Sequence, residues 1–254
     1  MERSYFSGTS GLLLPYRNKS FYPAKWQNKS RLSVYSLLFN SLEVNSSFYK
    51  MPRMETVRRW SEETEEGFKF TFKLWRGITH QKELTFEMTD VTKFLNIISA
   101  AGDKKGCLLI QLPPSIQFAS FINLEKLLYC IAANGQSEGW QISVEFRDSS
   151  WYRQETLELL QSYKMNLVLH DKDGKGLNRF DSNMDVIYIR FHGPNGDYRE
   201  SYEDALLYEY SLYINEYLAK GKTVYTYFNN TIGSAIANLK TLEGYIRKNS
   251  IYHI

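Results

Sequence analysis

From its sequence the chain is expected to have no signal peptide and no membrane-spanning helix. Residues 1–11 contain no apolar segment of the kind found in signal peptides, and no apolar run approaches the roughly 18 residues that a membrane-spanning helix needs. Cysteine is scarce, and Cys107 and Cys130 have no metal-type spacing. We therefore expect a cytoplasmic protein with two reduced, buried thiols and no membrane segment.

A strong charge of one sign and the common catalytic motifs are missing as well. The net charge is +3 and no run of five or more basic residues occurs, which is too mild to indicate a nucleic-acid partner by itself. The sequence has no P-loop, no nucleophile elbow, no H-E-x-x-H motif and no G-x-G-x-x-G motif after the first predicted strand. These absences leave the class of reaction open.

The composition is that of an ordinary globular protein, with 43% hydrophobic and 23% charged residues. A chain of 254 residues can form one large domain or two small ones. Because the sequence contains no linker and no low-complexity tract, we expect a single domain over residues 1–254.

Eight strand-like segments alternate with helical patterns along the chain. In the fifth segment, Ile142, Val144 and Phe146 alternate with polar residues, as expected for a strand. The eight segments are Tyr5–Thr9, Ser41–Asn45, Phe68–Trp75, Cys107–Leu112, Ile142–Arg147, Asn166–His170, Val186–His192 and Thr223–Asn229. This order predicts a single parallel (β/α)8 TIM barrel, with a doubly wound open sheet as the alternative.

Two details of the helical pattern can be checked directly. The segment 172–185 is polar and contains glycine, so we expect a weak or missing helix after the sixth strand. Ser201 and Asp204 have the spacing of a capping box, which predicts that they open the long helix that follows.

Polar side chains gather near the C-terminal ends of the predicted strands, where TIM barrels hold their functional sites. On the second, third, fifth, seventh and eighth strands they lie on the face opposite to the apolar residues that would contact the helices. A charged side chain on the inner face of a buried strand costs free energy of folding, so it is expected to have an oppositely charged partner or a functional role. The candidate site residues are Thr9, Ser10, Glu43, Asn45, Lys73, His80, Gln111, Glu145, Arg147, Asp171, Arg190, His192, Asn229 and Asn230.

A buried network that only fills the barrel would also explain single residues such as Gln111 or Asn229, because buried polar groups are usually hydrogen-bonded. It explains the whole set less well. The interior layers of these barrels are normally branched aliphatic side chains, and so many ionisable groups would be costly as filling. We assign His170 to this structural role.

The charges of the candidates favour an anionic ligand. Three cationic side chains oppose three carboxylates, and two histidines can add positive charge. A divalent metal site needs an excess of carboxylate and neutral imidazole, so we expect no metal and no cofactor. Arg147, Arg190 and Lys73 would hold a phosphate or carboxylate. Glu145 or Glu43 could then act as general base and His192 or His80 as general acid, with Asp171 as a further catalytic candidate.

Several stretches together resemble one family along nearly the whole chain. They are Gly8–Gly11, Phe21–Pro23, Glu43–Tyr49 with Pro52, Phe70–Lys73 with Thr79 and His80, Gln111–Pro114, Val144–Arg147 with Ser150 and Trp151, Arg190–Gly193, and Tyr227–Thr231. This pattern resembles the YecE-like proteins, domain-of-unknown-function family seventy-two. The resemblance implies a TIM-barrel fold and no established activity. Family members usually follow the first Gly-Thr-Ser-Gly with a tryptophan, a tyrosine and a second tryptophan, whereas this chain has Leu12, Leu14 and Arg17 at those places.

Two classes of function remain. The first is a hydrolase or isomerase that acts on a small anionic substrate, phosphorylated or sugar-like, at the C-terminal mouth of the barrel. The second is a non-catalytic protein that binds a small anion or a nucleic-acid backbone, which would need a basic rim outside the pocket. A metal-dependent phosphodiesterase is a minor alternative.

Overall fold

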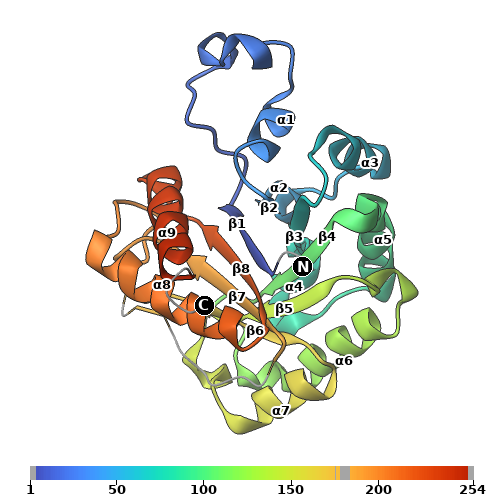
Figure 1. Ribbon diagram of the computed structural model, residues 1–254. Helices are drawn as coiled ribbons and strands as arrows, with labels where there is room; N and C mark the ends of the chain where they lie inside the picture. Colours follow the sequence, from blue (N-terminus) through green and yellow to red (C-terminus); the bar gives the residue numbers. More distant parts are fainter. Residues whose placement is uncertain (1–3, 175, 178–183, 251–254) are drawn as a thin grey trace. The chain divides into compact units, whose positions relative to one another are not determined.

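The computed structural model describes residues 4–174, 176–177 and 184–250. Strands and helices alternate along the chain (Figure 1). The eight strands follow the order β1-β8-β7-β6-β5-β4-β3-β2, and every described strand pairing is parallel. This is the topology of a (β/α)8 TIM barrel, so the predicted fold class is confirmed.

The strands coincide closely with the segments predicted from period-2 patterns. They are β1 (Tyr5–Thr9), β2 (Ser41–Val44), β3 (Lys69–Lys73), β4 (Lys105–Gln111), β5 (Gln141–Glu145), β6 (Asn166–His170), β7 (Val186–Phe191) and β8 (Thr223–Phe228). Most residues on both faces of these strands are buried, as expected for parallel strands covered by helices. The polar residues within them therefore need partners inside the protein.

The helices connect successive strands. They are α1 (Arg31–Ser36), α2 (Ser46–Tyr49), α3 (Met54–Glu63), α4 (Arg76–Thr79), α5 (Met88–Ile98), α6 (Phe121–Ala132), α7 (Gln154–Ser162), α8 (Asp204–Ala219) and α9 (Ala235–Ser250). The described residues of the segment 172–185 contain no helix, whereas residue 175 and residues 178–183 lie outside the described part. None of the described helices is both long and apolar enough to cross a membrane.

The predicted capping box before α8 is wrong. The N-cap of α8 is Glu203, and no side chain caps the helix there. The hydroxyl of Ser201 instead accepts a hydrogen bond from Asn238 Nδ2 at 2.9 Å. The Ser201 hydroxyl, which the local spacing predicted to cap α8, is instead hydrogen-bonded to a residue of α9.

The chain divides into two compact units, which are described separately. The terminal unit comprises Met1–Glu43 and Leu169–Ile254, and the central unit comprises Val44–Val168. The expectation of a single domain stays a prediction.

In the terminal unit, β8 lies between β1 and β7. Thr9 pairs with Phe228, and Phe191 also pairs with Phe228. An isolated parallel bridge between Ser10 and Glu43 joins the end of β1 to β2. Helices α8 and α9 pack against each other (Figure 1). The unit therefore brings the ends of β1, β2, β7 and β8 together.

In the central unit, β4 lies between β3 and β5. Lys73 pairs with Leu109, and Gln111 pairs with Glu145. Phe146 stacks on Trp151 with ring centroids 4.8 Å apart, and both side chains are almost fully buried. This aromatic contact fixes the chain just after β5, next to Arg147.

Candidate functional site

A buried ion pair between Glu43 and Arg190 lies in the terminal unit. Glu43 belongs to β2 and Arg190 to β7, and their side chains are 0% and 1% exposed. Arg190 Nε lies 2.9 Å from Oε2 of Glu43, and Nη2 lies 2.7 Å from Oε1. This two-pronged contact is the strong form of an arginine–carboxylate pair. Either charge would be very costly at this depth without the other.

Two further groups donate hydrogen bonds to the same carboxylate. Ser10 Oγ donates to Oε1 of Glu43, and the hydroxyl of Tyr188 donates to Oε2. Four donors therefore occupy the carboxylate of Glu43, which is held as the anchor of Arg190. Sequence reasoning missed Tyr188 as a site residue. Its position two residues before Arg190, on the same face of β7, was the signal that could have found it.

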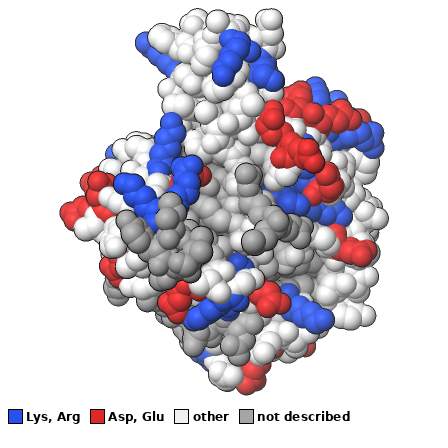
Figure 2. Space-filling model, in the orientation of Figure 1, with Lys and Arg blue, Asp and Glu red and all other residues white. Residues whose placement is uncertain are grey.

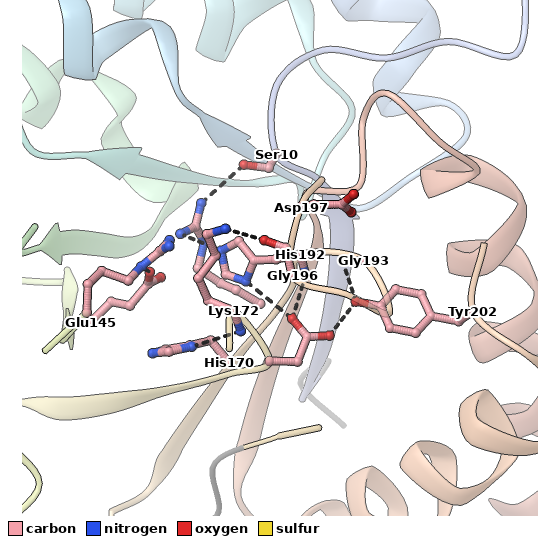
Figure 3. Close-up of polar contacts among 12 residues, drawn as sticks. Ser10, Glu145, His170, Lys172, His192, Gly193, Gly196, Asp197 and Tyr202 are labelled. Carbon is pink, nitrogen blue, oxygen red and sulfur yellow. Dashed lines mark hydrogen bonds and ion pairs between the residues drawn. The ribbon is translucent and has the colours of Figure 1, made fainter. Parts of the chain in front are cut away.

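Asp171 and His192 form a second contact at the ends of β6 and β7. The backbone N–H of His192 donates to Asp171 Oδ1 at 2.7 Å, and His192 Nδ1 lies 3.3 Å from the same oxygen. The hydroxyl of Tyr202 donates to Asp171 Oδ2 and accepts the N–H of Gly193 at 2.6 Å (Figure 3). Burial and the Asp171 carboxylate raise the pKa of Tyr202 far above its usual value, so this phenol stays a donor.

Arg190 connects the two contacts and sets the tautomer of His192. Nη1 of Arg190 lies 3.3 Å from Nε2 of His192. A guanidinium only donates hydrogen bonds, so Nε2 must be the acceptor and the proton must sit on Nδ1, facing Asp171. The side chain of His192 is fully buried. The terminal unit thus contains a continuous polar chain from Tyr202 through Asp171, His192 and Arg190 to Glu43.

The loop after β7 is held in place by contacts that need glycine. The φ angles of Gly193 and Gly196 are +100° and +66°, and a Cβ on Gly196 would lie 2.1 Å from the carbonyl oxygen of Lys172. Lys172 Nζ donates to the carbonyl of Gly196 and lies 4.4 Å from the ring centroid of Tyr198 (Figure 3). Sequence reasoning singled out neither Lys172 nor Tyr198.

The remaining predicted residues of the terminal unit lie outside this chain of contacts. The backbone N–H of Thr9 donates to the hydroxyl oxygen of Tyr35 at 2.8 Å, and the hydroxyl of Thr9 donates to the carbonyl of Gly11. Asn230 Nδ2 donates to the carbonyl of Glu200 and to Asn238 Oδ1, which ties the loop after β7 to α9. Asn229 is half-buried at the end of β8.

In the central unit, Glu145 and Arg147 contact each other directly. Arg147 Nε donates to Glu145 Oε1. The side chain of Arg147 is 9% exposed and that of Glu145 is 0% exposed. The backbone of Glu145 also accepts the N–H of Leu112 at 2.9 Å. Gln111 lies beside Glu145 in the sheet and is nearly buried. Three predicted residues therefore meet at the ends of β4 and β5.

Lys73 and His80 meet around the ring of Phe48. Lys73 Nζ lies 4.1 Å from the ring centroid of Phe48, and the imidazole of His80 packs edge-on against the same ring at 4.8 Å. His80 Nδ1 lies 2.8 Å from the hydroxyl oxygen of Thr79. Asn45, the other candidate near this point, is half-buried at the start of α2.

The surroundings of His80 are positively charged. Its pKa is lowered to about 4, first by burial and then by the charges of Lys73, Arg76 and Arg147. His80 is therefore neutral at neutral pH, and the potential at its ring favours a negative charge nearby. Sequence reasoning did not select Arg76, which begins α4 after β3.

A cavity of about 470 Å³ opens beside His80. One wall consists of His80–Glu83 from the segment after β3, and the other consists of residues from the segment after β4, including Ser115, Gln117 and Ser120. Both segments follow the C-terminal ends of strands, where TIM barrels place their sites. His80 belongs to the wall of this cavity, which also carries the charged side chains of Lys82 and Glu83, whereas Lys73, Arg76 and Arg147 are not among its lining residues. Its lining residues other than His80 were not predicted.

Within the described part of the chain, no group of three or more histidine, cysteine, aspartate or glutamate side chains is arranged to hold a metal ion. The minor alternative of a metal-dependent phosphodiesterase is tested by elemental analysis of the purified protein.

Comparison with known proteins identifies the family. The family model described as "Protein of unknown function DUF72" matches residues 6–251. The chain belongs to the DUF72 family. The resemblance to YecE-like proteins expected from the sequence motifs is thereby confirmed.

Two curated relatives illustrate the extent of the similarity. The UPF0759 protein YunF of Bacillus subtilis (strain 168) is 28% identical over 251 residues, which cover 86% of this chain and 87% of YunF. The UPF0759 protein YecE of Escherichia coli (strain K12) is 38% identical over 82 residues, which cover 32% of this chain and 30% of YecE.

Solved structures of DUF72 proteins share the fold. A DUF72 family protein from Enterococcus faecalis V583 superimposes with a TM-score of 0.78 at 19% identity, covering 96% of this chain and 95% of that one. A DUF72 family protein from Thermotoga maritima MSB8 gives a TM-score of 0.63 at 23% identity, covering 98% and 100%. At this level of identity the similarity concerns the fold alone.

Proposed function

We propose that this DUF72 protein is an enzyme, a hydrolase or isomerase, that acts on a small anionic substrate, phosphorylated or sugar-like, at the C-terminal ends of β3, β4 and β5. One observation carries the proposal. The pKa of His80 is lowered to about 4 at the wall of a cavity, with three cationic side chains contributing to the shift. A phosphate or carboxylate in that cavity would meet a favourable potential.

The acid–base groups of the central unit supply the chemistry in this proposal. Glu145 is the general base, and Arg147 orients its carboxylate through the Nε contact. His80 is a neutral imidazole, which suits hydrogen bonding to a substrate oxygen that gains negative charge. Lys73 and Arg147 hold the anionic group.

The candidates of the terminal unit have a different role in the proposal. Glu43 accepts four hydrogen bonds, and Nε2 of His192 accepts from Arg190. Because these acceptor atoms already hold hydrogen bonds within the protein, Glu43 and His192 are better suited to positioning other groups than to direct proton transfer. Their assignment as catalytic residues stays a prediction.

Titration of His80 with inorganic phosphate tests the anion site. Bound phosphate should raise the pKa of His80, measured by NMR of its imidazole, because the anion offsets the neighbouring cations. The K73Q variant should bind phosphate about tenfold more weakly, as expected for one charge-assisted contact. Lys93, exposed on α5, provides the control substitution K93Q, which should change neither quantity. A His80 pKa that phosphate does not move would contradict the anion site.

Turnover separates the enzyme from the non-catalytic binding protein. Sugar phosphates probe isomerisation, and p-nitrophenyl phosphate probes hydrolysis. E145Q and H80Q should each lose turnover by a factor of about 10² or more while phosphate binding persists in E145Q. Phosphate binding without turnover of any probe by the wild-type protein would favour the anion-binding alternative.

A further inference from the structure

The segment between β1 and α1 carries charge of one sign. Residues 4–42 contain no aspartate or glutamate and five cationic residues. These five are Arg17, Lys19, Lys25, Lys29 and Arg31. We call residues 16–31 the basic segment. The whole chain is nearly balanced in charge, with 31 cationic and 28 acidic residues, so this local excess is a distinct feature.

The cationic side chains of the basic segment are available to a partner. Four of them are exposed and Lys29 is half-buried. Within the described part of the chain, none of the five takes part in an ion pair or a side-chain hydrogen bond. Figure 2 shows Lys and Arg without Asp or Glu over the η1 (Lys19–Phe21) and η2 (Ala24–Trp26) turns. A nucleic-acid partner would require a basic surface of this kind.

Aromatic side chains alternate with these charges. Phe21 is 60% exposed, so one face of its ring is open to a partner. Tyr16 contacts Tyr22 at 5.4 Å and Trp26 at 6.3 Å between ring centroids, and Lys25 Nζ lies 5.5 Å from the ring of Trp26. The aromatic cluster fixes the two short turns, so the exposed groups project from a defined backbone.

We propose that the basic segment binds single-stranded nucleic acid. The cationic side chains would contact successive phosphates, and Phe21 would stack on an unpaired base. This combination of a cationic track and an exposed aromatic is typical of surfaces that bind single strands without base specificity. The inference does not depend on the proposed enzyme, because it uses no residue of that site.

Two other anionic partners fit less well. Binding in a membrane interface needs an amphipathic helix, whereas the basic segment contains only single helical turns and one strongly exposed large apolar side chain. A DNA duplex keeps its bases stacked, so Phe21 would have nothing to stack on. Both partners are included as arms of the test.

Fluorescence anisotropy of a labelled oligonucleotide of about twelve thymidines tests the proposal. The full chain should bind this probe, and the logarithm of the affinity should fall linearly with the logarithm of salt concentration between about 50 and 200 mM. The triple variant R17Q/K19Q/K25Q should bind at least tenfold more weakly, and its salt slope should be smaller by about 2, because each lost phosphate contact removes about 0.7. F21A should weaken binding about tenfold and leave the salt slope unchanged.

The matched control is K93Q/K126Q/K240Q, which removes three exposed lysines from α5, α6 and α9. It should change affinity by less than about twofold. Circular dichroism confirms that each variant is folded. Three results would overturn the proposal: no binding of the probe at low salt, equal losses in the two triple variants, or tighter binding to duplex DNA or to phosphatidylserine vesicles than to the oligonucleotide.

Discussion

The guanidinium of Arg190 donates to the imidazole of His192, with Nη1 and Nε2 3.3 Å apart. Because a guanidinium only donates, Nε2 is the acceptor in this contact, and the imidazole proton lies on Nδ1, which is 3.3 Å from Asp171 Oδ1. The same guanidinium neutralises Glu43 through Nε and Nη2. Arg190 therefore sets the tautomer of one predicted catalytic residue, His192, and the orientation of another, Glu43.

Removing the charge of Glu43 should strongly destabilise the protein. E43Q leaves Arg190 buried without its counter-ion, and we expect the free energy of unfolding in urea to fall by about 3–5 kcal/mol. The double variant E43Q/R190M removes both charges and should recover part of that loss. K220Q breaks the exposed Lys220–Glu216 pair and should cost about 1 kcal/mol or less. An E43Q protein as stable as K220Q would show that the buried pair is not needed.

The same glycine-to-alanine change should have opposite effects at two positions. Gly196 has a φ of +66° and no room for a Cβ beside the carbonyl of Lys172, so G196A should destabilise by about 2 kcal/mol or more. Gly244 lies in α9 with nothing within 4 Å of an added Cβ, so G244A should stabilise by about 0.5–1 kcal/mol. Thermal or urea unfolding of the two variants gives the change in stability, and its sign, for each substitution. Equal effects would contradict the loop geometry after β7.

Stability should depend on pH through His80. Its pKa is about 4 in the folded chain against 6.5 for the free group. Between these values the unfolded chain binds more protons, so the free energy of unfolding should rise as the pH is raised from 4 to 6.5. His80 is half-exposed, and solvent screening limits the effect to at most about 2 kcal/mol.

H80Q provides the comparison for this pH dependence. The glutamine cannot titrate, so the part of the slope between pH 4 and 6.5 that belongs to His80 should disappear. K73Q should raise the pKa of His80 toward its usual value, and K93Q should leave it unchanged. Identical slopes for wild type and H80Q would show that the imidazole titrates normally.

Much of the fold could be predicted from the sequence because period-2 patterns depend only on neighbouring residues. The contact between Glu145 and Arg147 was also within reach, since two residues at that spacing share a face of one strand. The pair formed by Glu43 and Arg190 was not, because 147 residues separate the partners and only the assembled sheet brings them together. The capping box at Ser201 failed for the same reason.

The sequence predicted one polar layer of site residues. In the structure these residues form separate groups of contacts within the terminal unit and within the central unit. Ser10, Glu43, Asp171, Arg190 and His192 share a network in the terminal unit. The low pKa of His80 depends first on burial and then on the charges of Lys73, Arg76 and Arg147, and the spacing of residues does not show this environment. Electrostatic environment is a property of the folded chain and needs coordinates.

The division of the chain also affects the order in which its contacts can form during synthesis. All contacts within the central unit join residues between Val44 and Val168, so they are available once that stretch has left the ribosome. Glu43 is made early, but Arg190 follows 147 residues later. The buried carboxylate of the terminal unit must therefore stay hydrated through most of translation, and the charge network closes only after the central unit has been made.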